Sequence, residues 1–183
     1  MARRARRHFR GGRVVDLAAG HGLLAHVMLL LDDTSPRAVA VDTRVPKSAP
    51  RVHDALVAAW PRLRDRVVFE EGDLSSFPLR ADDVVVSAHA CGDLTDTVLA
   101  RASEVGARVV VLPCCHDERD RVGSYLEGWL DPALALDVAR VERLRQRGYT
   151  VRTQHIPAEV TPKNRLLLAA PPSRTSPARA DSR

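Results

Sequence analysis

Cysteine is scarce in this sequence, with three residues among 183. Two of them, Cys114 and Cys115, are adjacent, and the third is Cys91. An odd number of cysteines in a chain without a secretion signal argues against a disulfide framework. We therefore expect reduced thiols, whose chemistry is of more interest than any cross-link.

Long apolar runs are also missing. No stretch is long enough to cross a bilayer, and the arginine-rich N-terminus lacks the apolar segment of a signal peptide. We therefore expect a cytoplasmic protein without a membrane partner. Hydrophobic residues make up 45% of the 183 residues, which is enough to bury the core of a single domain.

Positive charge is concentrated at the two ends of the chain. Residues 1–13 carry six arginines and no acid, and residues 172–183 carry a net charge of +2. Because the whole chain carries +5, the part between these ends is negative, at −3. We interpret residues 1–12 as a basic N-terminal arm and residues 172–183 as a disordered tail. A basic arm adds affinity for RNA phosphates, although an arginine-rich end can equally be a solvated tail.

A glycine turn follows the first apolar segment. Residues 14–17 suit a buried parallel strand that contains a carboxylate, Asp16, and Gly20 and Gly22 come directly after it. Glycine permits backbone conformations and close approaches that a β-carbon would prevent. The next run, residues 23–31, has helical length and composition. Strand, glycine turn and helix in this order begin the nucleotide-binding half of a doubly wound sheet.

The turn leaves two ligands open, because its glycine spacing also satisfies the dinucleotide fingerprint of NAD-binding proteins. Asp16 favours S-adenosylmethionine over NAD. A carboxylate there repels a pyrophosphate, whereas it accepts hydrogen bonds from an ammonium and lies well beside a sulfonium. A purely structural turn is the third interpretation.

Two further strand ends carry carboxylates. Asp42 ends the second strand, where doubly wound folds hold ribose hydroxyls, and Asp73 follows the third strand, where it can accept the adenine amino group. Either carboxylate can instead cap a turn. The cofactor-binding residues that we predict are Asp16, Ala18, Gly20, Gly22, Asp42, Asp73 and Leu74.

The remaining segments complete a Rossmann-like, doubly wound α/β sheet of seven strands. The predicted strands are residues 14–17, 37–42, 66–72, 84–88, 108–112, 149–156 and 165–170. Residues 157–164 are too few for a helical crossover, so the last two strands should form an antiparallel hairpin. The rest of the sheet should be parallel, with helices at residues 23–31, 48–60, 93–106 and 131–148.

Histidine and cysteine side chains follow the fourth and fifth strands. His89 comes after the fourth strand, and Cys114, Cys115 and His116 come after the fifth. The carboxyl ends of parallel strands share one edge, so these residues should converge on the ligand cleft. Imidazole accepts protons near neutral pH. We predict His89 or His116 as the general base, with Cys115 shaping or polarising the same pocket.

Other interpretations of these residues stay open. Zinc could be held by His89, Cys91 and residues 115–116, although adjacent cysteines lack the usual chelating spacing. A cysteine could attack a pyrimidine base as a nucleophile. A cysteine at the end of a buried strand can also be a small apolar filler, which is the structural interpretation of Cys114. We predict direct transfer without a metal.

Three segments together resemble a known family: DLAAGHG (16–22), SAHACGDLTD (87–96) and PCCH (113–116). The combination resembles the class I S-adenosylmethionine-dependent methyltransferase domain of several eukaryotic methyltransferase-like proteins and of glutathione S-transferase C-terminal domain-containing protein. It is similar, more distantly, to eukaryotic tRNA 2′-O-methyltransferases with a Cys-Cys-His segment.

The resemblance implies a methyltransferase domain at residues 13–171, with S-adenosylmethionine as cofactor. It implies direct methyl transfer, with RNA or a protein ahead of a small molecule as acceptor. The zinc module of the tRNA enzymes is absent, as is the Asp/Asn-Pro-Pro-aromatic segment of enzymes that methylate base amino groups. A non-catalytic module that binds S-adenosylmethionine or RNA is the alternative. Neither the acceptor atom nor the oligomeric state follows from the sequence.

Overall fold

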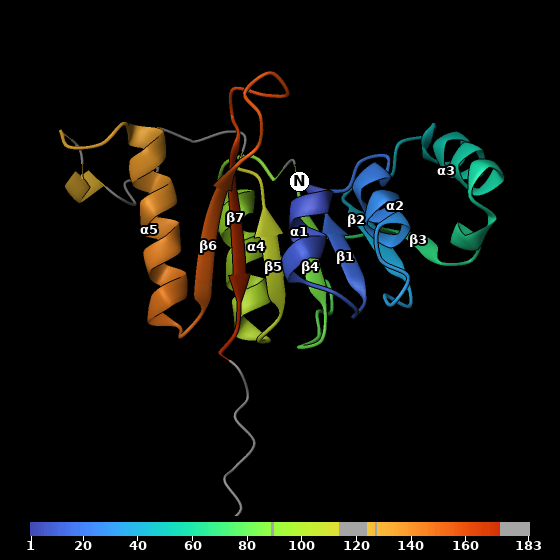
Figure 1. Cartoon of the computed structure of the whole chain (residues 1–183), viewed down its shortest axis with the longest axis horizontal. Coiled ribbons are helices and arrows are strands. Elements are labelled where there is room, and N and C mark those ends of the chain that lie inside the picture. The colour runs from blue at the N-terminus through green and yellow to red at the C-terminus, as the bar shows by residue number, and fades with distance from the viewer. Residues whose placement is uncertain (89, 114–123, 127, 173–183) are drawn as a thin grey trace, which may run out of the picture.

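The computed structural model describes residues 1–88, 90–113, 124–126 and 128–172, which form a seven-stranded sheet flanked by helices (Figure 1). The strand order is β3-β2-β1-β4-β5-β7-β6. Strands β1 to β5 run parallel, whereas β7 is antiparallel to both β5 and β6. The strands are β1 (Val14–Leu17), β2 (Ala38–Asp42), β3 (Val67–Glu71), β4 (Val84–Ser87), β5 (Arg108–Val111), β6 (Thr150–His155) and β7 (Arg165–Ala170).

Five α-helices accompany the sheet in the described part of the chain, with 3₁₀ turns at Pro61–Leu63 and Ser124–Leu126. None of these helices combines the length and the apolar character that crossing a membrane requires. The helices are α1 (Ala2–His8), α2 (Leu23–Leu30), α3 (Ala49–Ala59), α4 (Asp93–Glu104) and α5 (Pro132–Gln146).

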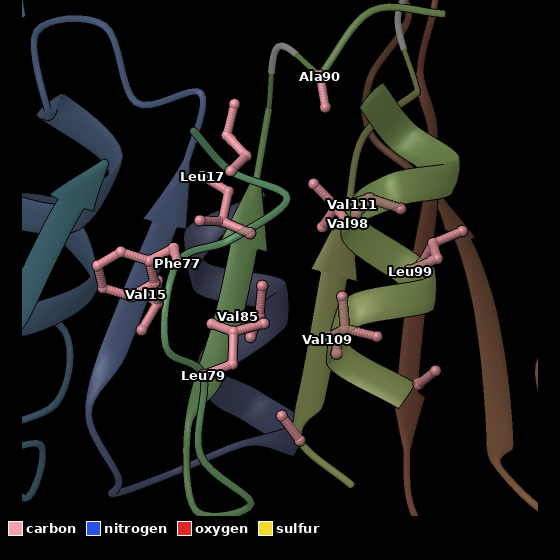
Figure 2. Packing of buried hydrophobic residues seen from close by; sticks show 14 of the residues in the cluster. Val15, Leu17, Phe77, Leu79, Val85, Ala90, Val98, Leu99, Val109 and Val111 are labelled. Atoms are coloured by element: carbon pink, nitrogen blue, oxygen red, sulfur yellow. The ribbon is translucent and has the colours of Figure 1, made fainter. Parts of the chain in front are cut away.

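The sheet has a hydrophobic cluster on each face. Val14 of β1 belongs to the cluster that contains residues of α1 and α2. Its neighbour Val15 belongs to the opposite cluster, where Figure 2 shows it with Val85 of β4 and with Val98 and Leu99 of α4. Because successive residues of a strand point to opposite faces, a strand covered on both sides must be apolar throughout. This explains the valine-rich central strands.

The predicted fold class is confirmed: the sheet has seven strands, mostly parallel, and its C-terminal pair is antiparallel. The third strand starts and ends one residue inside its predicted bounds. Strand β1 pairs with both β2 and β4, so the carboxyl ends of these three strands are neighbours at one edge. Of the predicted tail, only Pro172 lies within the described residues.

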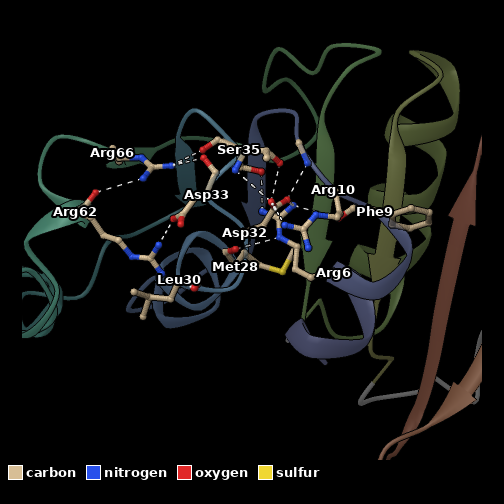
Figure 3. Close-up of polar contacts among 12 residues, drawn as sticks. Arg6, Phe9, Arg10, Met28, Leu30, Asp32, Asp33, Ser35, Arg62 and Arg66 are labelled. Carbon is tan, nitrogen blue, oxygen red and sulfur yellow. Dashed lines mark hydrogen bonds and ion pairs between the residues drawn. The ribbon is translucent and has the colours of Figure 1, made fainter.

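The segment predicted as a basic arm contains helix α1, which packs against α2. The guanidinium of Arg6 is buried, and it donates hydrogen bonds to the Met28 carbonyl at 3.0 Å and to the Ser35 hydroxyl at 2.9 Å (Figure 3). It also forms an ion pair with Asp32 at 3.2 Å. Arg13 likewise pairs with buried Asp83 at 2.8 Å. Two of the six arginines are therefore parts of the interior.

Candidate cofactor site

The carboxyl ends of β1, β2 and β4 border a cavity of about 1300 Å³. Four of the predicted cofactor-binding residues line it: Asp16, Ala18, Gly20 and Asp42. Further lining residues come from the whole length of α2, from Val52 of α3, from the start of α4 and from the N-terminal part of α1. The cavity therefore lies where the sequence places a ligand, and α1 adds a wall that the sequence did not reveal.

The two glycines of the turn have different roles, although both adopt the left-handed conformation, with φ of +53° at Gly20 and +69° at Gly22. A β-carbon on Gly20 would meet no atom within 4 Å, so bare backbone borders the cavity there. A β-carbon on Gly22 would lie 2.7 Å from the Phe69 ring and 3.1 Å from the Ala40 side chain. Gly22 is therefore required for close packing of α2 on the sheet.

Ala18 shares the left-handed conformation, with φ of +59°, although it carries a β-carbon. This conformation costs an alanine about 1–2 kcal/mol, and such strain is concentrated at functional sites. Ala18 is the first residue after β1 and lines the cavity. The strained turn places the backbone around Gly20 against the cavity.

Asp42 connects the end of β2 with the glycine turn. Its Oδ2 accepts a hydrogen bond from the Gly20 N–H at 2.8 Å, and its Oδ1 lies 3.4 Å from the backbone nitrogen of Arg44. The side chain also lines the cavity. A carboxylate has about four lone-pair sites, so turn capping leaves acceptor capacity for a ligand hydroxyl.

Asp16 is almost completely buried, with 1% of its surface exposed. Its Oδ2 accepts one hydrogen bond, from the Ala25 N–H at 3.1 Å. Burial raises the pKa of Asp16 to about 8, and the nearby charge of Asp42 adds to this rise, while the Ala25 hydrogen bond opposes it. A positively charged ligand group in the cavity would favour the ionised carboxylate.

Two histidines that were not predicted as site residues lie behind the glycine turn: His26 contacts the turn, and His53 contacts His26. The Gly22 carbonyl accepts a hydrogen bond from Nδ1 of fully buried His26 at 2.7 Å, and Nε2 of His26 lies 3.0 Å from Nδ1 of His53. A carbonyl can only accept, so Nε2 of His26 in turn accepts from His53. Burial lowers the pKa of His26. Phe69 packs against both rings.

Asp73 and Leu74 are not among the residues that line this cavity. The exposed carboxylate of Asp73 accepts hydrogen bonds from the N–H of Ser75 at 2.9 Å and from its hydroxyl, and these bonds lower the pKa of Asp73. Leu74 is buried with Phe77 in the hydrophobic cluster on the α4 face. The contacts of Asp73 are those of a turn cap, and its adenine contact stays a prediction.

The predicted catalytic residues His89, Cys115 and His116 lie outside the described residues, as does Cys114. The strands that precede them are neighbours, because β4 pairs with β5 in parallel register, with Ser87 opposite Val111. Ala88, directly before His89, lines the cavity. No group of three metal-ligating side chains is present in the described part of the chain, and most ligands of the zinc hypothesis lie beyond it.

The segment after His89 is anchored by a buried arginine. Arg140 of α5 pairs with Asp96 of α4 at 2.7 Å and approaches the Gly92 carbonyl at 3.5 Å. Thr95 donates a hydrogen bond to the Ala90 carbonyl. These contacts fix the start of α4, whose Leu94 is 40% exposed and lines the cavity.

A family model and several solved structures match this chain, and they describe methyltransferases. A family model described as a methyltransferase domain matches residues 1–121. No curated protein matches the sequence. The fold is similar to that of an O-methyltransferase family protein from Burkholderia thailandensis, with a TM-score of 0.59 and 20% identity over 93% of this chain and 53% of the other. This chain thus spans about half the length of that protein.

Two other solved structures share the fold at lower sequence identity. A putative rRNA-methylase from Clostridium thermocellum has a TM-score of 0.60 and 14% identity, over 92% of each chain. A ribosomal protein L11 methylase from Lactobacillus delbrueckii subsp. bulgaricus has a TM-score of 0.58 and 12% identity, over 92% of this chain and 74% of the other. At these identities the similarity concerns the fold.

Proposed function

The chain belongs to the methyltransferase domain family, and on this premise we propose that it transfers a methyl group from S-adenosylmethionine directly to an acceptor. The observation that carries the proposal is the cavity at the ends of β1 and β2, where Asp16, Gly20 and Asp42 lie together. These are the residues that the sequence assigns to this cofactor.

The charges of the cavity favour S-adenosylmethionine over NAD. Two carboxylates, Asp16 and Asp42, line it, and burial, with a contribution from the charge of Asp42, raises the pKa of Asp16. S-adenosylmethionine brings an ammonium and a sulfonium, which stabilise carboxylates. The pyrophosphate of NAD would add negative charge next to the carboxylate of Asp42, and it would hold Asp16 in its uncharged form.

Each residue has a defined task in the proposed reaction. Asp16 binds the ammonium, Asp42 binds the ribose hydroxyls, and Gly20 lets the ligand lie against the backbone. The bound cofactor supplies a methyl group that its sulfonium makes reactive. His89 or His116 accepts the proton of the acceptor, and Cys115 shapes the pocket, without a covalent cysteine intermediate.

We propose RNA or a protein as the acceptor. The support is the resemblance of residues 16–22, 87–96 and 113–116 to the eukaryotic methyltransferase-like proteins and, more distantly, to the tRNA 2′-O-methyltransferases. Two structures with the same fold are named as a putative rRNA-methylase and a ribosomal protein L11 methylase, and these names match the two kinds of acceptor proposed.

Ligand binding tests the cofactor. S-adenosylmethionine and its demethylated product should bind, and NAD should not. The change Asp42→Ala should weaken S-adenosylmethionine binding by about 1–3 kcal/mol, the range for a lost hydrogen bond to a charged group. Isothermal titration calorimetry measures both effects. The control is Asp82→Ala, which removes an exposed carboxylate shortly before β4, at the opposite edge of the sheet.

Tight binding of NAD without any response to S-adenosylmethionine would contradict the proposal. Methyl transfer itself is tested by mass spectrometry of RNA and protein from cells that contain or lack the chain. A modification present only with the chain identifies the acceptor. Cofactor binding without a modified acceptor would instead favour the non-catalytic module.

A further inference from the structure

The cavity contains one strongly basic side chain among the described residues that line it, Arg3 of helix α1. Two carboxylates, Asp16 and Asp42, line the same cavity. S-adenosylmethionine has two positive centres and one negative group, the carboxylate of its methionine part. Asp16 is assigned to the ammonium and Asp42 to the ribose hydroxyls, which leaves Arg3 as the matching group for the ligand carboxylate.

Other arginines near the N-terminus are engaged within the protein. Arg4 donates to the Gln154 side chain at 3.2 Å, Arg6 is buried against Asp32, and Arg10 pairs with the same carboxylate at 3.0 Å. Arg3 is exposed and forms no hydrogen bond or ion pair with any other described residue. Its five N–H donors are therefore available to a ligand.

Helix α1 holds Arg3 at a fixed place beside the cavity. Ala5 is fully buried in the cluster beneath the helix, and Figure 3 shows Arg6 inserted among Met28, Ser35 and Asp32. Because α1 is locked by these contacts, binding through Arg3 costs little ordering of the backbone. A preorganised cation binds an anion more tightly than the same cation on a mobile arm.

We propose that Arg3 binds the carboxylate of S-adenosylmethionine, so that α1 is a wall of the cofactor site. The guanidinium fork matches a carboxylate with two parallel hydrogen bonds. This proposal rests on the proposed function, because it requires S-adenosylmethionine as the ligand. It assigns an arginine of the basic segment to the cofactor instead of to RNA.

The test compares two ligands that differ only in the carboxylate, S-adenosylmethionine and its decarboxylated form, by isothermal titration calorimetry. Arg3→Ala should weaken binding of S-adenosylmethionine by about ten-fold to a hundred-fold, the range for a charge-assisted hydrogen bond. Binding of the decarboxylated ligand should stay unchanged. Arg3→Lys should lose less, because an ammonium keeps the charge but not the fork.

Arg7→Ala is the matched control, since Arg7 lies exposed on the same helix, outside the residues that line the cavity. It removes the same charge and should leave both affinities at the wild-type value. Thermal midpoints of all variants verify that they are folded. An Arg3→Ala variant that behaves like Arg7→Ala, or that loses both ligands equally, overturns the proposal. A wild-type protein that binds neither ligand overturns the proposed function as well.

Discussion

The proposed binding of a cationic ligand beside a single carboxyl group, that of Asp16, should depend on pH. Its surroundings raise the pKa to about 8, so the group carries a proton at neutral pH, and a cation bound beside it requires that this proton leave. The affinity for S-adenosylmethionine should therefore rise with pH up to about 8. The same burial affects stability. The folded state binds this proton more tightly than the unfolded state, in which the pKa is near 3.8.

The change Asp16→Asn should make this contribution visible. The free energy of unfolding of the wild type should fall as pH rises from about 4 to 8, because the folded state binds the extra proton, and level off above about 8. Asparagine keeps the acceptor for Ala25 and never ionises. The variant should therefore have a thermal midpoint several degrees above that of the wild type at pH 8, since 1 kcal/mol shifts the midpoint by about 2–4 °C at this size.

Near pH 4 the two proteins should melt at similar temperatures. Midpoints measured without cofactor between about pH 4 and 9 check this difference. The variant should also bind S-adenosylmethionine more weakly at pH 8, so stability and binding change in opposite directions. If the thermal midpoints of the wild type and the variant instead differ by the same amount at every pH, Asp16 has the same pKa in the folded and unfolded states.

Some of the site can be predicted from residue types alone, and some cannot. A carboxylate within an apolar strand and glycines after it have few structural explanations, so Asp16 and Gly20 were predicted at the cavity that they line. His26 was not predicted as a site residue, because it stands within an otherwise apolar helix. Its partners, the Gly22 carbonyl and His53, contact its ring only in the folded chain. The exposed Asp73 lies in a local turn, a pattern that sequence cannot distinguish from a ligand contact.

At the scale of elements, helix α1 was the part of the described fold that the sequence did not predict. Seven residues are too few for a stable isolated helix, and its arginines obscure the apolar side formed by Ala2 and Ala5. The helix exists because Arg6 is buried with partners that lie beyond residue 27. Such a long-range ion pair has no local signature.

Removal of the Arg6 side chain should therefore cost far more than removal of a neighbouring arginine. Arg6→Ala removes one of the two ion-pair partners of Asp32, whose side chain is fully buried, and it also removes the donor to the Met28 carbonyl and the Ser35 hydroxyl. The expected loss is about 3–5 kcal/mol of unfolding free energy, whereas Arg7→Ala should stay within about 0.5 kcal/mol. Urea denaturation measures both. Equal effects of the two changes would mean that α1 is not anchored through Arg6.

The residue types of the last two strands also predict which of them lies at the edge of the sheet. Strand β7 is apolar in its interior and buried from Leu166 to Ala169, whereas β6 has one apolar residue, Val151, and is largely exposed. Uninterrupted apolar residues suit a strand with neighbours on both sides, and polar ones suit an edge. The pairing of β7 with β5 follows from this contrast, while the spacing of the hairpin predicts only that β6 and β7 are antiparallel.

For the whole molecule, the arginines of residues 1–13 support RNA binding less strongly than their number in the sequence suggests. Arg6 and Arg13 are buried in ion pairs, and Arg10 shares Asp32 with Arg6. The exposed arginines of α1 are Arg3 and Arg7. If they bind single-stranded RNA, each phosphate neutralised contributes about −0.7 to the slope of log affinity against log salt.

The double change Arg3→Ala with Arg7→Ala should flatten that slope by about 0.7 for each phosphate that is no longer neutralised. Fluorescence anisotropy with a labelled single-stranded RNA at several salt concentrations provides the slopes. Deletion of residues 1–10 is a poorer test, because it also removes the buried Arg6. An unchanged slope in the double variant would exclude Arg3 and Arg7 as RNA-binding residues.

The place of β7 between β5 and β6 also determines when the sheet can be completed during synthesis. A ribosome delivers β1 to β5, with Asp16 and Asp42, well before β7. Until β7 emerges, β5 has an open edge, and β6 has no strand through which to join the sheet. An open edge invites pairing with another chain. A transcript cut before codon 165 would therefore encode the predicted cofactor-binding residues intact, on a nascent protein that is prone to aggregate.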